Sequence, residues 1–143
     1  MGFEVSVVVA IFFISAVIVG TLSYTTLTTT SDIAADASAE QHEMQTKRLN
    51  TEIEIDSSIA GVFNGTYDLT VTMTNTGSET LDFDELNVLI DGSLKEYAFS
   101  DTAVTWVPEE TRNLTVSNLE GTGSHRVKVI TENGIADYAT YVV

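Results

Sequence analysis

The side chains that could do chemistry are few, and the densest group consists of carboxylates. Asp82, Asp84 and Glu85 lie almost consecutively, and Asp91 follows nearby. Clustered carboxylate oxygens are the ligands that hard cations such as Ca²⁺ prefer. The spacing matches no EF-hand loop, however, and a solvated acidic turn explains the group more simply. We therefore expect no metal site.

The two histidines, His42 and His125, offer little for catalysis. A histidine-based triad needs an activated nucleophile beside the imidazole, and the sequence has no recognisable nucleophile motif, nucleotide-binding glycine loop or metalloprotease helix. It also has no cysteine, so neither a thiolate nucleophile nor a disulfide can form. We expect both histidines to be solvent-exposed. The sequence predicts a protein that is not an enzyme, without catalytic residues or a cofactor.

Charge excludes further classes of partner. The formal net charge is −15, and residues 51–143 contain sixteen Asp and Glu against four Lys and Arg. Nucleic-acid binding needs a basic patch that releases counterions, so we expect no nucleic-acid partner. An anionic lipid surface would also repel this region. The acidic residues are dispersed, which is typical of a solvated surface.

Two sequons permit N-glycosylation, one at Asn64 and one at Asn113. Such sequons also arise by chance in a chain rich in threonine, and unmodified asparagines near turns or strands are the alternative. Together with the acidic charge, the sequons favour a location outside the cell for the C-terminal part.

A hydrophobic run near the N-terminus is the strongest signal in the sequence. Residues 5–27 are mostly apolar, and residues 5–19 contain no charge. About 20 such residues are needed to cross a bilayer. A secretory signal peptide would begin with Lys or Arg, whereas Glu4 has the opposite sign. No polar face interrupts residues 7–19, as it would in the helix of a soluble core. A retained membrane anchor or the apolar spine of a helical filament remains.

The helix is expected to continue beyond this run. Residues 31–49 contain no Pro or Gly and are rich in helix formers. One helix from about residue 4 to residue 48 would form a stalk, although Ser31 could cap a second helix if residues 25–30 break the first. Hydroxyl groups in the threonine-rich part can bond back to carbonyls one turn earlier, which makes them tolerable in apolar surroundings.

After Leu49 the hydrophobic period changes from that of a helix to that of strands. Tyr67, Leu69, Val71 and Met73 alternate with polar residues, as in a half-buried strand. Further candidate strands and turns follow at close spacing, which is typical of an all-β sandwich. The predicted strands are residues 51–56, 67–75, 86–90, 95–99, 103–107, 112–119, 126–131 and 135–143, with a turn at residues 61–65.

These signals predict a mainly β protein with one long N-terminal α-helix. We expect a hydrophobic helix and stalk at residues 1–49, followed by an immunoglobulin-like antiparallel β-sandwich at residues 50–143.

The N-terminal residues also resemble a known family. Residues 1–14, Met-Gly-Phe-Glu-Val-Ser-Val-Val-Val-Ala-Ile-Phe-Phe-Ile, are similar to the opening of archaellum (archaeal flagellum) stator proteins of the F and G types. Residues 48–53 resemble the helix-to-strand junction of the F type. Archaellins, the filament subunits, share the architecture and are the close alternative. Their precursors normally carry a short basic leader that ends in Gly, and nothing basic precedes Gly2 here, which favours the stator types, of which the F type is preferred.

The resemblance implies a mechanical role in motility. F-type members anchor the static part of the motor by binding S-layer protein with the β domain, while G-type members and archaellins form filaments. The implied partners are S-layer protein, other archaellum subunits, the membrane and further copies of the chain. The implied location is the archaeal cell envelope, with the β domain outside, or an extracellular filament. The residues expected to contact lipid or neighbouring helices are Phe3, Val5, Val9, Phe12, Phe13 and Ala16.

Overall fold

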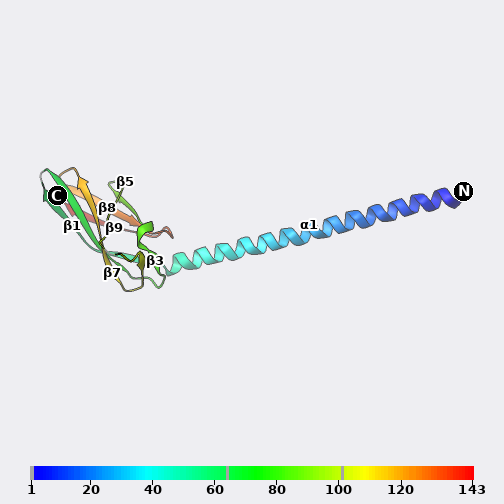
Figure 1. The fold of residues 1–143 in the computed structure, drawn as a ribbon, viewed down its shortest axis with the longest axis horizontal. Helices are drawn as coiled ribbons and strands as arrows, with labels where there is room; N and C mark the ends of the chain where they lie inside the picture. Colours follow the sequence, from blue (N-terminus) through cyan, green and yellow to red (C-terminus); the bar gives the residue numbers. More distant parts are fainter. Residues whose placement is uncertain (1, 64, 101) are drawn as a thin grey trace. The chain divides into compact units, whose positions relative to one another are not determined.

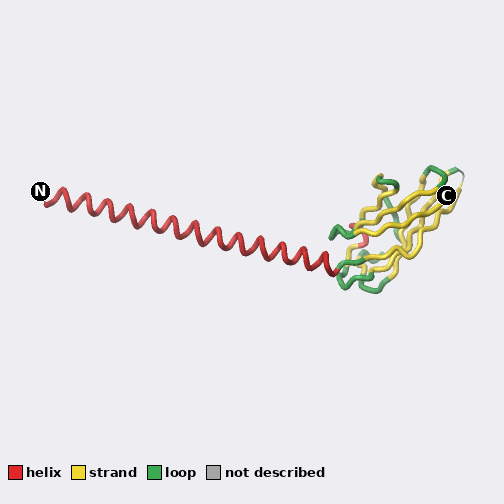
Figure 2. The backbone as a smooth tube through the Cα atoms, turned by 180° about the vertical axis from the view of Figure 1, so that it is seen from behind, coloured by secondary structure: helices red, strands yellow, loops and turns green. Residues whose placement is uncertain are grey.

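The computed structural model describes residues 2–63, 65–100 and 102–143. It begins with a single helix, α1 (Gly2–Asn50), which runs without interruption (Figure 2). The predicted continuous helix is therefore confirmed, and no second helix begins at Ser31. Backbone contacts divide the chain into two compact units, Met1–Glu43 and Met44–Val143, so the last two turns or so of α1 belong to the same unit as the strands. Whether residues 1–49 and 50–143 behave as separate domains stays a prediction.

The described residues after α1 form nine strands and one short 3₁₀ helix, all strand pairs being antiparallel (Figure 1). One sheet has the order β1-β2-β7, a second has the order β5-β4-β8-β9, and β3 pairs with β6. The elements are β1 (Ile53–Phe63), β2 (Thr66–Asn75), β3 (Leu81–Asp82), η1 (Phe83–Glu85), β4 (Asn87–Ile90), β5 (Ser93–Lys95), β6 (Thr105–Trp106), β7 (Thr111–Leu119), β8 (Ser124–Ile130) and β9 (Ala136–Val142).

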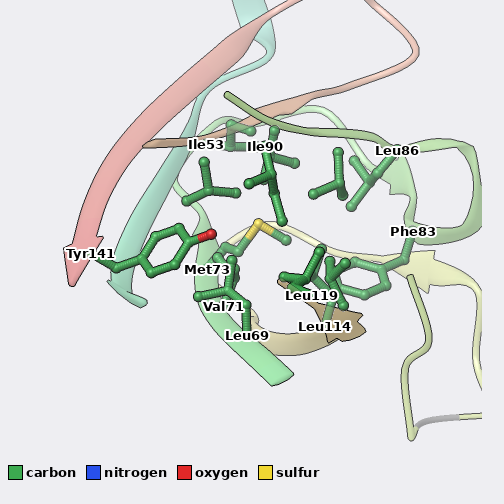
Figure 3. Packing of buried hydrophobic residues seen from close by; sticks show 14 of the residues in the cluster. Ile53, Leu69, Val71, Met73, Phe83, Leu86, Ile90, Leu114, Leu119 and Tyr141 are labelled. Atoms are coloured by element: carbon green, nitrogen blue, oxygen red, sulfur yellow. The ribbon is translucent and has the colours of Figure 1, made fainter. Parts of the chain in front are cut away.

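The core lies between the two larger sheets and follows from the alternation in the sequence. Along β2, Tyr67, Leu69, Val71 and Met73 are all buried, as their spacing predicts. Figure 3 shows Met73 with its sulfur in the middle of the labelled apolar side chains. Each such side chain contributes about 1.5–3 kcal/mol when it leaves water. An N-terminal helix followed by an antiparallel β-sandwich is thus the architecture that the sequence predicts.

Two local predictions were wrong. Residues 61–65 were expected to turn, but β1 continues through Gly61 to Phe63, because Gly61 pairs with Asp68 of β2. The hairpin closes only after Phe63, and Asn64 lies outside the described residues. Residues 95–99 were expected to form a strand, but β5 ends at Lys95 and only Ala98 makes an isolated bridge, to Thr115 of β7.

Candidate functional site

The first half of α1 is apolar on all sides and is not covered by the rest of the chain. None of the described residues of α1 is buried, and Phe12 and Phe13 are 78% and 71% exposed. At 100° per residue, Val5, Val9, Phe12, Phe13 and Ala16 share one face of the helix. A large exposed apolar surface marks a site of interaction.

The apolar surface extends beyond that face. By the same helical spacing Phe3 lies on the opposite side, and Val7, Val8, Ile11 and Ile14 are exposed as well. A helix that is hydrophobic all round is normally surrounded by apolar material, either other helices or lipid. The predicted stripe is therefore part of a surface that needs contacts in every direction. The contacts of the six predicted residues with lipid or with neighbouring helices stay a prediction.

The Ser and Thr hydroxyl groups of residues 15–30 are satisfied within the helix. Thr21 Oγ1 donates to the Val17 and Ile18 carbonyls at 3.0 and 2.9 Å, and Thr26 Oγ1 donates to the Leu22 carbonyl at 2.8 Å. Ser15, Ser23, Thr25, Thr28, Thr29 and Thr30 make equivalent bonds three or four residues back. The predicted back-bonding is confirmed. These side chains therefore present methyl and methylene groups outward and need no water.

Charge separates the two halves of α1. After Glu4 the next charged residue is Asp32, and from there the helix is polar. Residues 5–27 span about 35 Å at 1.5 Å per residue, close to the roughly 30 Å of a bilayer's hydrocarbon core. By length and composition alone, α1 could cross a membrane. Core helices of soluble proteins and signal sequences pass the same test, so this property does not decide what surrounds the helix.

The end of α1 is tied to the strands by a set of short hydrogen bonds. The carbonyl of Asn50 accepts from the backbone N–H of Ser78 at 2.8 Å, and the carbonyl of Glu52 accepts from that of Gly77 at 2.9 Å. Thr51 Oγ1 donates to the Lys47 carbonyl at 2.7 Å and lies 2.9 Å from Nδ2 of Asn133, which donates to it. The loops after β2 and β8 therefore fix the last turn of the helix.

The predicted carboxylate group does not form one site. Asp82, Asp84 and Glu85 lie at or next to η1, where they are joined by Glu132, whose Oε2 accepts from the Asp82 N–H at 3.2 Å. Burial, followed by the nearby charges of Asp82 and Glu85, raises the pKa of Glu132. No local pattern in the sequence indicates this contact across 50 residues. Among the described residues, no group of three or more His, Cys, Asp or Glu is placed to hold a metal ion.

Asp91 lies elsewhere, in the turn between β4 and β5, where it contacts His125. His125 Nδ1 is 2.7 Å from Asp91 Oδ2, and Asp91 Oδ1 accepts from the Arg126 N–H at 2.9 Å. The hydrogen bond from His125 is the main cause that lowers the pKa of Asp91. The predicted exposure of His125 was wrong. Its side chain is only 16% exposed because the ring stacks on Tyr141 and lies beside Tyr67.

The second sequon falls on an exposed strand face. Asn113 is exposed in β7, which is an edge strand, and pairs with Thr72 of β2. An oligosaccharide on this side chain would extend into solvent, so the site is sterically open. Glycosylation of Asn113 and Asn64 stays a prediction.

Comparison with known proteins decides the family. A family model described as archaeal-type flagellin matches residues 2–140. The chain belongs to the archaeal-type flagellin family. It is also similar to a chain from a solved structure described as the archaeal flagellum of Methanospirillum hungatei strain JF1. That match has a TM-score of 0.69 and 18% identity, and it covers 100% of this chain and 93% of the other. At this identity the likeness shows the fold. No curated protein gave a significant match.

Family membership corrects the emphasis of the sequence analysis. Archaeal-type flagellins are structural filament proteins of the archaeal flagellum, found at or beyond the cell surface, and they are not enzymes. The archaellin alternative is therefore supported. The stator role of the F or G type, S-layer binding and membrane anchoring are not supported. The preference for the stator rests on the short motifs at residues 1–14 and 48–53 and on the lack of a basic residue before Gly2, and the family match over residues 2–140 outweighs these local signals.

Proposed function

We propose that the chain is a filament subunit of an archaeal flagellum, which polymerises by packing the apolar half of α1 against the same segment of neighbouring copies. The observation that carries this proposal is the conformation, exposure and hydrogen bonding of residues 5–27, which are the apolar half of α1. They form one regular helix that is apolar all round and exposed in the chain, and its Ser and Thr hydroxyl groups from Ser15 onward bond to the helix backbone. Such a segment is suited to the dry centre of a helical bundle.

The energetics of the proposal are favourable. Burying one large apolar side chain contributes about 1.5–3 kcal/mol, and α1 carries many of them, including Phe3, Phe12 and Phe13. Association costs about 4–15 kcal/mol in lost translational and rotational freedom, and the ordering of side chains adds to this cost. The many exposed apolar side chains between Phe3 and Leu27 together can offset it. The formal charge of −12 on residues 51–143 favours placing the β-sandwiches at the outside, where solvent and counterions screen their repulsion.

The same segment is suited to lipid before assembly. Its length matches a bilayer core, and its threonine hydroxyl groups already bond to backbone carbonyls of the same helix. In this proposal a membrane would hold the monomer until neighbouring helices replace the lipid around it.

The location of the subunit tests the proposal directly. Antibodies against the β-sandwich should label flagellar filaments along their whole length in immunogold electron microscopy of the producing cells. Labelling confined to the filament base or to the cell envelope would instead support a stator and would overturn the proposal.

A substitution in α1 provides the second arm of the test. Phe12→Lys should abolish filaments, because a buried ammonium group would lie among apolar side chains. Phe12→Leu keeps the surface apolar and serves as the matched control, which should assemble. Equal filament yields from the two variants would contradict packing through this half of the helix.

A further inference from the structure

Positive charge is scarce on the β-sandwich, and what is available lies largely on one face. Of the four basic residues at 51–143, Arg112 is buried and pairs with Glu110 at 2.9 Å. The other three are Lys95, Arg126 and Lys128. Arg126 and Lys128 are two residues apart on β8, so both project from the same side of the β5-β4-β8-β9 sheet.

That side is the outer face of the sheet. Val127 and Val129, which alternate with the two basic residues, are fully buried in the core. The strand register places Lys128 between Tyr138 of β9 and Leu89 of β4, and Leu89 in turn pairs with Leu94 of β5. A row of apolar and basic side chains thus crosses all four strands. We call Leu89, Leu94, Arg126, Lys128 and Tyr138 the outer-sheet patch.

The cations of the outer-sheet patch are held by the aromatic ring between them. The Arg126 guanidinium carbon lies 5.4 Å and the Lys128 ammonium nitrogen 5.1 Å from the centre of the Tyr138 ring. Each cation–π contact contributes about 0.5–1 kcal/mol at an exposed site. The ring is 50% exposed and Leu94 is 66% exposed. Tyrosine and arginine are enriched among the side chains that dominate protein–protein interfaces.

The charge of the chain indicates which partner binds the outer-sheet patch. A cationic patch on an apolar base fits an acidic protein surface, and every copy of this chain carries such a surface. Asp82, Asp84, Glu85 and Glu132 lie together near η1, and mutual crowding contributes to the raised pKa of Glu132. A cation from a neighbour would relieve that repulsion. Because the basic and the acidic surface lie on the same β-sandwich, each subunit can offer one and accept the other, which gives a head-to-tail contact that continues along a polymer.

We propose that the outer-sheet patch docks on a carboxylate-bearing surface of the β-sandwich of a second copy, and so joins neighbouring subunits outside the helical core. The proposal rests on the proposed filament function. It also gives that function an electrostatic component, because subunits that carry this much negative charge would otherwise only repel each other at the surface of the filament.

Reversing the charge of one lysine on each face of the β5-β4-β8-β9 sheet tests the proposed contact between subunits. In the full-length chain, Lys128→Glu should raise the concentration of subunit left unassembled by about tenfold or more, as expected for breaking a desolvated charge pair. Lys95→Glu makes the same change of charge on β5. Lys95 pairs with Val88, whose side chain is buried, so it belongs to the other face and should leave assembly unchanged. Lys128→Met keeps an apolar stem and should show a smaller loss than Lys128→Glu.

The three variants separate the two proposals. If the unmodified chain forms no filaments, the proposed function fails. If the unmodified chain and all three variants assemble equally well, the outer-sheet patch has no role and this inference fails alone. Thermal unfolding of each full-length variant, followed by the fluorescence of the buried Trp106, checks the fold, and a folded Lys128→Met variant still decides the matter if Lys128→Glu does not fold.

Chemical modification gives an independent measurement. Acetylation by an amine-reactive reagent should be slower at Lys128 in purified filaments than in dissociated chains, whereas Lys95 should react equally in both. If Lys128 is protected only on cells and not in purified filaments, the patch binds a different partner, such as an envelope protein, and the inference is overturned. Equal reactivity of Lys128 in filaments and dissociated chains would overturn it as well.

Discussion

Gly77 lies directly against Asn50, the last residue of α1. A Cβ atom built on Gly77 would come within 2.5 Å of the Asn50 carbonyl oxygen and 2.6 Å of the Glu52 nitrogen. The same loop donates two backbone hydrogen bonds to the Asn50 carbonyl, from Ser78 at 2.8 Å and Glu79 at 3.2 Å. The absence of a side chain at residue 77 thus allows the loop after β2 to bond the end of the helix.

Gly77→Ala should destabilise the chain by about 1–3 kcal/mol, because the added methyl group meets backbone atoms that cannot rotate away. Gly61→Ala is the matched control, since its Cβ would lie 3.9 Å from the nearest atom, the Asp68 carbonyl oxygen. We expect that control to change stability by less than about 0.5 kcal/mol. Chemical unfolding of the full-length variants, followed by Trp106 fluorescence, measures both. Equal stabilities would show that the loop can move away from Asn50.

Much of this fold could be predicted because its signals are local. The alternation along β2 and the turn residues at Asp91-Gly92 and Asn133-Gly134 depend on neighbours in sequence, and the structure has the expected strand and hairpins there. The contact between Gly77 and Asn50 could not be predicted, because nothing in a Thr-Gly-Ser turn indicates which distant backbone lies against it.

The end of β1 shows the same limit. The sequence predicts a turn at Gly61, but its pairing with Asp68 extends β1 through this residue. Likewise the burial of His125 depends on Tyr67 and Tyr141, which come from two other strands. Tertiary contacts override local preference at both positions.

The protein should lose stability in alkali because of one buried tyrosine pair. The hydroxyl groups of Tyr67 and Tyr141 are buried and lie 2.9 Å apart. Burial, followed by the hydrogen bond with Tyr67, raises the pKa of Tyr141 well above its ordinary value of 10.0. The folded state therefore holds this proton more tightly than the unfolded state. The contribution to stability is complete below pH 10 and is lost progressively as the pH rises above it.

Tyr141→Phe should flatten this alkaline decline, at the cost of about 1 kcal/mol at neutral pH for the lost hydrogen bond. Free energies of unfolding measured from pH 7 to pH 11 test the expectation. Tyr138→Phe, in the same strand but half exposed, is the control and should follow the unmodified chain. A decline that stays equally steep in Tyr141→Phe would assign the alkaline effect to other groups.

Glu132 should oppose folding at neutral pH. Burial and the neighbouring Asp82 and Glu85 raise its pKa above the ordinary 4.5. A carboxyl group with a raised pKa in the folded state favours folding while protonated, and this contribution is lost as the pH rises through the folded value. Glu132→Gln removes the charge and keeps an oxygen that can accept from the Asp82 N–H.

We therefore expect Glu132→Gln to be more stable than the unmodified chain at pH 7 and equally stable below about pH 4, where the glutamate is protonated. Thermal unfolding at several pH values measures the difference. Glu79→Gln, which alters a carboxylate elsewhere in the chain, controls for the general effect of lowering net charge. A gain that persisted at pH 3 would rule out the charge of Glu132 as its cause.

Exposure of Asn113 on the edge strand β7 predicts that a glycan can be attached there. Mass spectrometry of protein purified from its native cells should find a peptide that contains Asn113 with added sugar mass. Both Asn113→Gln and Thr115→Val should remove it, because each destroys the sequon. Asn118→Gln alters a nearby asparagine outside any sequon and should leave the mass of the glycan unchanged. An unmodified Asn113 in the native protein would contradict the expectation.

The sequence predicts only those features of assembly that depend on residues close together in the chain. The length, the lack of charge and the hydroxyl back-bonding of α1 follow from residues within one or two turns of each other. The outer-sheet patch does not, because Lys128, Tyr138 and Leu89 meet only through the pairing of β4, β8 and β9. Its residues look like ordinary strand positions until the register is known.

The threonines of α1 give the sharpest test of an apolar environment around the helix. Thr26 Oγ1 is already bonded to the Leu22 carbonyl, so Thr26→Val replaces a satisfied hydroxyl with a methyl group and should leave filament formation intact. Thr26→Lys should abolish it, because an ammonium group would have to leave water. Ala37→Lys places the same charge in the polar half of the helix and should be tolerated. Filament counts by negative-stain electron microscopy measure all three. If Thr26→Lys assembled as well as Ala37→Lys, the threonine-rich part of α1 would have to face water, and the dry core would end before residue 26.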